Sequence, residues 1–225
     1  MTEIRTVAET GSTNDDVAAL ARAGAKEGIW LRAERQTGGK GRQGRAWQSP
    51  AGNLHASTLV RLQPGDPPAP TLALVAAVAL HEALRPYASA ARIKWPNDLL
   101  VAGAKLAGIL LERQGDAVIL GFGVNLAHHP EDLDRPATSL NPPIAPDSFL
   151  PRLAAVFEAW LGRWRADGLA PIRTAWLAAA HPPGTALTTG DVHGAFDGLD
   201  ESGALRLRLE DGGLRIIHAG DVFLL

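Results

Sequence analysis

The stretch Gly38–Trp47, GGKGRQGRAW, constrains the fold most, because it suits neither a helix nor the interior of a strand. Four glycines in ten residues give the backbone too much freedom for regular structure. We therefore predict a loop over residues 36–51, between two strands. Glycine lets backbone amides approach an anion closely, and Lys40, Arg42 and Arg45 carry charge that suits phosphate or carboxylate.

This loop does not match the common nucleotide-binding motifs. No Gly-Lys-Ser/Thr closes it, so it is not a Walker A loop, and its glycines do not stand at a strand–helix turn, as those of the dinucleotide-binding GxGxxG motif do. From this stretch alone, a mobile surface loop with solvated charges is an equally good interpretation.

Composition narrows the class of protein. The chain has 225 residues, 46% of them apolar, which suffices for one full domain and a small appendage. A net charge of -2 argues against bulk attraction to nucleic acid, and the lack of cysteine excludes disulfides and thiolate metal sites. Charged and polar residues interrupt the Ala-rich run at residues 70–84 before it reaches membrane-spanning length. The N-terminus also lacks the apolar core of a signal peptide, so we expect a soluble, cytoplasmic protein.

The order of predicted elements is that of an α+β domain. Strands and helices do not alternate strictly, so we expect a mixed, largely antiparallel sheet flanked by helices. Apolar periodicity predicts strands at residues 4–8, 30–34, 54–62, 91–95, 98–101, 105–113 and 118–126, and helices at 12–25, 71–84, 148–166 and 172–180.

The tail of the chain has a different character. Glycine recurs every few residues after His181-Pro182-Pro183-Gly184, and the leucines of the stretch 205–209 alternate with charged residues. Short strands joined by glycine and aspartate turns indicate a small β-barrel. We therefore expect two domains, at residues 1–183 and 184–225.

A second informative stretch is KWPNDLL, at residues 94–100. Pro-Asn-Asp by itself is an ordinary turn. Lys105, however, starts the return strand of a predicted short hairpin, which would bring its amine back towards Asn97 and Asp98. A cation beside an Asn/Asp pair suits a phosphate and its Mg²⁺.

These stretches, taken with three others, resemble the biotin–protein ligases in order and spacing. The other three are KLAGILLE at residues 105–112, GFGVN at 121–125 and ATSL at 137–140. The resemblance covers essentially the whole chain. It implies the class II synthetase-like catalytic fold of biotin and lipoate ligases, with a small SH3-like C-terminal β-barrel. Because the catalytic pattern begins within about a dozen residues of Met1, we expect the monofunctional form without an N-terminal DNA-binding domain.

The resemblance also implies the residues of the site. Lys105 and Arg42 are the implied catalytic residues, and Asn97 and Asp98 the implied Mg²⁺ contacts. Lys40 stands where the family usually has arginine, which keeps the charge but loses the planar fork. The implied biotin contacts are Ser12, Thr13, Asn14, Gln36, Gly39, Lys40, Gly41, Arg42, Lys105 and Gly108. The implied ATP contacts are Arg42, Arg45, Trp47, Lys94, Asn97, Asp98, Lys105 and Asn125.

The implied reaction has two steps. The biotin carboxylate attacks the α-phosphorus of ATP to give biotinyl-5′-AMP and pyrophosphate. A lysine of a biotin carboxyl carrier protein, from acetyl-CoA carboxylase or a related carboxylase, then takes the biotin. The alternatives are a lipoate–protein ligase or octanoyltransferase of the same superfamily, and a non-catalytic biotin-binding regulator. No DNA or membrane partner is expected, and a homodimer is left open.

Overall fold

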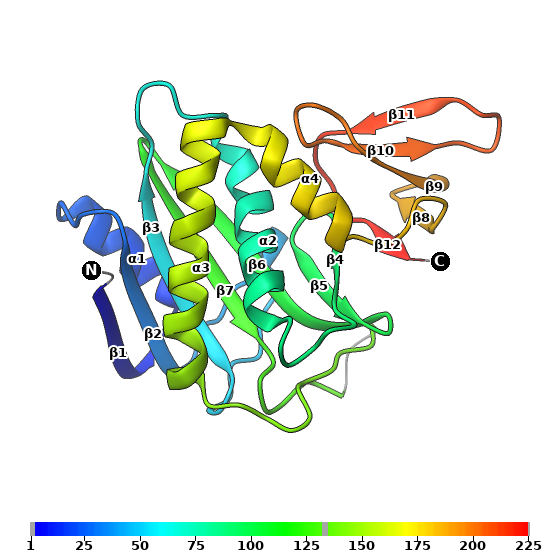
Figure 1. Ribbon diagram of the computed structural model, residues 1–225. Coiled ribbons are helices and arrows are strands. Elements are labelled where there is room, and N and C mark those ends of the chain that lie inside the picture. Colours follow the sequence, from blue (N-terminus) through cyan, green and yellow to red (C-terminus); the bar gives the residue numbers. More distant parts are fainter. Residues whose placement is uncertain (1–2, 132–134, 225) are drawn as a thin grey trace.

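A computed structural model describes residues 3–131 and 135–224, and in it a seven-stranded sheet carries most of the chain (Figure 1). The strand order is β1-β2-β3-β7-β6-β5-β4, and among the described strands only the β1–β2 pair is parallel. The predicted mixed, largely antiparallel sheet is thus confirmed. Its strands are β1 (Glu3–Thr10), β2 (Ile29–Gln36), β3 (Leu54–Arg61), β4 (Arg92–Lys94), β5 (Asp98–Val101), β6 (Ala104–Gln114) and β7 (Ala117–Val124).

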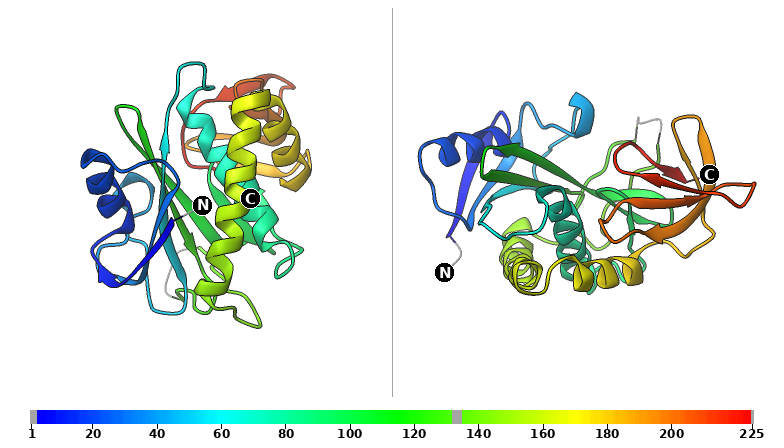
Figure 2. Two further views of the ribbon diagram at one scale, coloured as in Figure 1. Left: turned by 60° about the vertical axis from the view of Figure 1, so that its left-hand side comes forward. Right: turned by 90° about the horizontal axis from the view of Figure 1, so that it is seen from above.

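Helices cover the two faces of this sheet unequally. The helix α1 (Thr13–Arg22) lies on one face, and α2 (Leu72–Leu84), α3 (Pro146–Asp167) and α4 (Leu169–Ala179) lie on the other (Figure 2). The four helices agree with the predicted ones to within one turn. Two short 3₁₀ turns, η1 (Arg42–Gly44) and η2 (Ala69–Thr71), complete the helical segments. No helix in the described ranges is long and apolar enough to cross a membrane.

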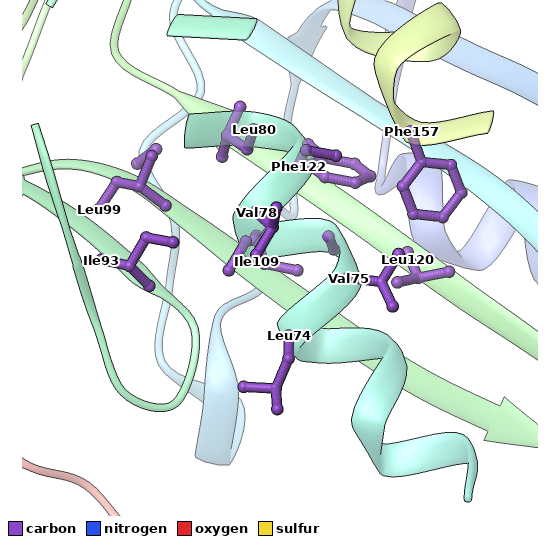
Figure 3. Close-up of a cluster of buried hydrophobic side chains, with 14 of the residues drawn as sticks. Leu74, Val75, Val78, Leu80, Ile93, Leu99, Ile109, Leu120, Phe122 and Phe157 are labelled. Carbon is purple, nitrogen blue, oxygen red and sulfur yellow. The ribbon is translucent and has the colours of Figure 1, made fainter. Parts of the chain in front are cut away.

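The main core lies between the sheet and the pair α2 and α3. The helix α2 is sandwiched there, so nearly all of its side chains are apolar. Figure 3 shows Val75 and Val78 of α2 above Ile109 and Leu120 of the strands β6 and β7. Phe157 of α3 meets Phe122 of β7 edge to face, with ring centroids 6.0 Å apart. This packing fixes the position of the central strands, and with it the position of the side chains on their opposite face.

That opposite face is only partly covered. Leu59 and Ile119 pack under Val17 of α1 in a smaller apolar cluster. Further along β3, the same face presents the buried polar residues His55 and Ser57. Polar side chains on the inner face of a central strand indicate that this part of the sheet faces a site rather than a core.

The C-terminal part is the predicted small β structure, an all-antiparallel sheet in the order β11-β10-β9-β8-β12. Its strands are β8 (Ala186–Thr189), β9 (Val192–Leu199), β10 (Leu205–Arg208), β11 (Leu214–Ile217) and β12 (Phe223–Leu224). It packs on the large sheet through Trp95, whose Nε1 donates to the Gly203 carbonyl at 3.3 Å. Because such contacts join the two parts, the division into 1–183 and 184–225 stays a prediction.

Candidate active site

A pocket of about 780 Å³ lies on the sparsely covered face of the sheet. Its volume falls in the range of small-molecule sites. The glycine-rich loop, the β5–β6 hairpin and the C-terminal segment 221–224 enclose it. It brings together all of the predicted site residues except Gly39: Ser12, Thr13, Asn14, Gln36, Lys40, Gly41, Arg42, Arg45, Trp47, Lys94, Asn97, Asp98, Lys105, Gly108 and Asn125.

The loop folds back on itself as a very short hairpin. Lys40 and Ala46 form an isolated antiparallel bridge, and the Gly41 N–H donates to the Arg45 carbonyl at 2.7 Å. A Cβ at Gly39 would lie 2.6 Å from Ser49 Oγ, so close packing requires glycine there. Gly39 is not among the residues that line the pocket, and its biotin contact stays a prediction.

The hairpin carries Trp47 onto the strands β6 and β7. A Cβ at Gly123 would lie 2.7 Å from the indole Nε1, and one at Gly108 would lie 3.2 Å from the indole Cζ3. Glycine at both positions therefore makes the flat slot in which the ring lies. Lys105 Nζ is 5.4 Å from the ring centroid, a cation–π distance.

One end of the pocket is built from neutral hydrogen-bonding groups. Ser12, Thr13 and Asn14 are each 4% exposed, and Ser12 makes no side-chain cap hydrogen bond to α1. The Thr13 N–H donates to Gln36 Oε1 at 2.8 Å, so the amide of Gln36 must point its nitrogen the other way. That nitrogen donates to Ser49 Oγ at 2.9 Å. The backbone thus fixes the direction of hydrogen bonding at this end.

The other end is built around a buried carboxylate. Asp98 lies between Lys105 and Lys94, with oxygen–nitrogen distances of 2.7 and 3.2 Å. Burial would raise the pKa of Asp98, but the charges of Lys105 and Lys94 outweigh it and hold this pKa below its ordinary value. Burial lowers the pKa of Lys94, and Asp98 partly opposes that shift.

The local fold explains why Lys105 reaches this carboxylate. Ala102 and Gly103 connect β5 to β6 with φ angles of 49° and 82°, as in the tight turns that match strand twist. The hairpin returns Lys105 towards Asp98, which confirms the predicted geometry. Asn97 lies nearby, where its Oδ1 accepts from Arg42 Nη1 at 3.3 Å.

The arginines of the loop reach the C-terminal part of the chain. Arg45 pairs with Asp221 at 2.8 Å and Arg42 approaches the same carboxylate at 3.5 Å. Arg42 also donates to the Gly220 carbonyl at 3.0 Å. Sequence reasoning missed Asp221 because 178 positions separate Gly220 from Arg42 and no local pattern links them.

Lys40, which stands where arginine was expected, has a carboxylate partner. Its Nζ lies 2.8 and 2.6 Å from the two carboxylate oxygens of Asp15, on the first turn of α1. The hydrogen bond to Asp15 is the main cause that raises the pKa of Lys40. A single ammonium on two oxygens therefore ties the loop to α1, without a planar fork.

Asn125 braces the wall behind Lys105. The Lys105 N–H donates to the Pro136 carbonyl at 2.8 Å, and the Thr138 N–H donates to the Lys105 carbonyl at 3.0 Å. Asn125 Nδ2 donates to the Thr138 carbonyl at 3.0 Å. The ATSL stretch thus lies along the start of β6, while the predicted nucleotide contact of Asn125 stays a prediction.

Sequence reasoning also missed two residues of β3, one that lines this pocket and one that lies behind its neutral end. His55 lines it, with Nε2 3.1 Å from the Pro50 carbonyl, and burial lowers its pKa. Ser57, two residues further along β3, bonds Thr13 and Asn14. The alternation of residues along the strand could have indicated them. If Leu54, Ala56 and the other even positions of β3 face the core, the odd positions, His55 and Ser57 among them, face the opposite side.

The predicted Mg²⁺ pair does not fit a resident metal in this arrangement. Both oxygens of Asp98 face ammonium groups, and Asn97 Oδ1 faces a guanidinium. Over the described residues, no group of three or more His, Cys, Asp or Glu side chains is placed to hold a metal. No step of the chemistry is therefore derived through a metal held by these two residues.

The pocket as a whole defines a class of protein. Six cationic side chains and two acidic ones lie on its described wall, together with the neutral groups. A ligase that joins a carboxylic acid to a nucleotide must hold an organic head group and phosphates together. The neutral groups of this pocket suit the head group, and its cationic side chains suit the phosphates. The cationic side chains are Lys40, Arg42, Arg45, Lys94, Lys105 and Arg135.

Comparison with known proteins identifies the family. The chain belongs to the biotin/lipoate A/B protein ligase family, whose model matches residues 10–125, and the model of the biotin protein ligase C terminal domain matches residues 185–225. The chain is 41% identical to a biotin–[acetyl-CoA-carboxylase] ligase of Paracoccus denitrificans, over 96% of this chain and 98% of that protein. It is 37% identical to the Mycobacterium tuberculosis protein of the same name, over 98% and 88%.

A solved structure shares the fold. The biotin protein ligase of Aquifex aeolicus, in complex with biotin and ATP, superposes with a TM-score of 0.88 over 100% of both chains, at 24% identity. At that identity the likeness speaks for the fold alone, and it extends over the large sheet and the C-terminal part.

Proposed function

We propose that this chain is a biotin–protein ligase, which activates biotin with ATP to biotinyl-5′-AMP and transfers biotin to a lysine of a carrier protein. The observation that carries the assignment is the continuity of one pocket. It joins the neutral end at Thr13 and Gln36 to the cationic end at Lys105 and Arg42. The named relatives, similar over nearly the whole chain, support the same activity.

We assign the neutral end to the biotin head group. Ser12, Thr13, Asn14 and Gln36 offer hydrogen bonds to its ureido ring from buried, fixed positions. Trp47 lies over Gly108 and supplies an apolar surface for the rest of the molecule. Lys40 and Gly41 close this end from the loop side.

We assign the cationic end to the triphosphate and to the reacting groups. Two anions must approach each other in the first step, and positive charges that face the reacting oxygens lower the barrier. Lys105 and Arg42 are the catalytic residues in this assignment, because both lie where the biotin carboxylate and the α-phosphate would meet. Arg45, Lys94 and Asn97, with Asp98, Trp47 and Asn125, line the space left for the nucleotide.

The loop protects the product of the first step. A mixed anhydride hydrolyses in water, so closure of a loop over it preserves it until the acceptor arrives. The ion pairs of Arg42 and Arg45 with Asp221 hold the loop down against the C-terminal part.

We propose that Mg²⁺ enters as part of the substrate, MgATP. Mg²⁺ typically keeps several waters and binds substrate phosphates with few protein ligands, which agrees with the lack of a free carboxylate at Asp98. Asp98 is also a poor choice for the base that deprotonates the acceptor lysine, since its pKa is held low.

For the second step, we propose a biotin carboxyl carrier domain of acetyl-CoA carboxylase or a related carboxylase as the acceptor, and the cytoplasm as the compartment. The relatives of Paracoccus and Mycobacterium are named for that carboxylase. A homodimer stays a prediction, to be tested by light scattering of the pure protein.

The test is transfer of labelled biotin to a carrier domain in the presence of MgATP. We expect covalent label on the carrier, and none on a carrier whose target lysine is changed to arginine. Labelled lipoate with a lipoyl domain is the parallel reaction for the competing activity. Label on the lipoyl domain alone would overturn the assignment in favour of a lipoate ligase, and binding of biotin without any transfer would favour a regulator.

A further inference from the structure

Behind the neutral end of the pocket, four side chains form a continuous line of hydrogen bonds that ends on a carboxylate. Thr13 Oγ1 lies 2.7 Å from Ser57 Oγ, and Ser57 Oγ donates to Asn14 Oδ1 at 2.6 Å. Asn14 Nδ2 donates to Glu112 Oε2 at 2.6 Å. Glu112 is half-buried on β6 and does not line the pocket itself.

The carboxylate gives this line a single direction. A carboxylate only accepts, so Asn14 must turn its nitrogen to Glu112 and its oxygen to Ser57. Ser57 then donates its one proton to Asn14, and its oxygen is left to accept from Thr13. Glu112 thereby sets the orientation of every donor between itself and Thr13.

Thr13 has a second neighbour, which also accepts but at a longer distance than Ser57. Its Oγ1 lies 3.1 Å from Gln36 Oε1, an oxygen whose identity is fixed by the Thr13 N–H. Both neighbours of the hydroxyl are therefore acceptors, and its only proton stays within the protein. Towards the pocket, Thr13 has lone pairs alone.

We propose that Glu112 is a positioning residue that fixes Thr13 as a hydrogen-bond acceptor, so that this end of the pocket selects a ligand group carrying an N–H. The inference rests on the proposed function and deepens it. It explains how the site distinguishes a ureido ring from a ring in which oxygen replaces one nitrogen. The same line of hydrogen bonds requires glycine at position 121, because a Cβ there would overlap Asn14.

The test compares biotin with its two carbamate analogues, in which a ring oxygen replaces one or the other ureido N–H. A site built around an N–H rejects an analogue that lacks it, because an acceptor then faces an acceptor. For the natural chain, we expect calorimetry to show biotin bound about 100-fold more tightly than one of the two carbamates.

Glu112→Gln should reduce this preference about tenfold, because glutamine can donate to Asn14 and let the line reverse. Ser57 then donates to Thr13, and the Thr13 proton is free to turn from the longer contact with Gln36, at 3.1 Å, to an acceptor on the ligand. Asn14→Asp alone places a second carboxylate beside Glu112 and should weaken biotin binding. The double variant, Asn14→Asp with Glu112→Gln, should recover most of the preference, because a carboxylate at position 14 again forces Ser57 to donate to it. Recovery of this kind is not expected if Glu112 only supports the fold.

The control is Glu34→Gln, the same substitution at an exposed position of β2 whose nearest cation, Arg32, is 3.9 Å away. It should leave both affinities unchanged, and ATP binding should confirm that each variant is folded. An unchanged preference in Glu112→Gln, or a double variant no better than the single ones, would overturn the proposal. Absence of biotin binding in the natural chain would instead overturn the proposed function.

Discussion

The two ends of the pocket differ in how firmly their polar side chains are held. At the neutral end, Thr13 and Asn14 are buried, and each hydrogen bond has one permitted direction. At the cationic end, Lys105 and Arg45 keep 35% and 48% of their side-chain surface exposed, and their present partners are acids that an incoming phosphate can replace. We infer from this difference that the fixed neutral groups provide selectivity, while the charges provide attraction and catalysis.

Their places in the fold match these roles. The neutral groups sit on α1, β2 and β3, within the sheet and its covering helix. The charges sit on the loop, on the edge strand β4, on the β5–β6 hairpin, and at Arg135 and Asp221, outside the central strands of the sheet. Elements at the margins can move with less loss of packing, as closure over a ligand requires.

The largest effect is expected at the centre of the cationic end. Lys105→Ala should reduce the rate of adenylate formation by about 10²–10³-fold, because it removes the charge that faces both reacting anions. Biotin-dependent exchange of pyrophosphate into ATP measures this step. The control is Lys26→Ala, an exposed lysine just beyond α1, which should leave the rate unchanged. Near-normal exchange in the Lys105 variant would remove this residue from the mechanism.

A moderate effect is expected where the two ends meet, at the slot for Trp47. In Gly123→Ala the new methyl group would lie within 2.5–2.7 Å of indole atoms, so the ring must shift. We expect about 1–3 kcal/mol lower stability and a changed tryptophan fluorescence response to biotin.

The matched control for this slot is Gly162→Ala, within α3, where a Cβ meets nothing within 4 Å. It should instead stabilise the protein by about 0.5–1 kcal/mol. A Gly123 variant that behaves like the Gly162 variant in thermal unfolding would show that the slot is not needed.

A smaller effect is expected from the contact between the loop and the C-terminal part. Asp221→Asn removes the charge paired with Arg45 and Arg42, which are partly exposed, so we expect a change of about two- to fivefold in KM for ATP. The change should shrink at high salt. Asp211→Asn changes an exposed carboxylate of the same C-terminal sheet region and should have no effect on KM. Equal behaviour of the two variants would contradict the role of Asp221 in holding the loop.

The smallest effect concerns stability against pH. Burial lowers the pKa of His55, His81 and His181 below the ordinary value of 6.5. The unfolded chain then binds protons that the folded chain does not, so the free energy of unfolding should fall as pH falls below about 6.5. Asp98 does not contribute in this window, because its share is lost only below its ordinary value of 3.8.

Urea unfolding at pH 7.5 and pH 5.5 measures this dependence. His81 lies outside the pocket. In the His81→Gln variant, the free energy of unfolding should fall less between the two pH values, by at most about 1.4 kcal/mol per pH unit. Stability that rises on acidification in this window would contradict the assignment of these buried and half-buried histidines as neutral.

The sequence predicted those parts of the site that depend on neighbours along the chain. The approach of Lys105 to Asp98 followed from a short hairpin, and the helix at Thr13 followed from its polar start. The pairing of Asn14 with Glu112 spans 98 positions and depends on strand register, which no local pattern fixes. The ion pairs of Asp221 with Arg42 and Arg45 could not be predicted for the same reason.

The most direct test of the account is to trap the product of the first step. The protein would be mixed with biotin and ATP labelled at the α-phosphate, without a carrier, and separated from free nucleotide. We predict about one labelled biotinyl-5′-AMP retained per chain, discharged as AMP when the carrier domain is added. Label that is never retained, or that is retained equally without biotin, would contradict the claim that this pocket joins the two molecules and shields their product.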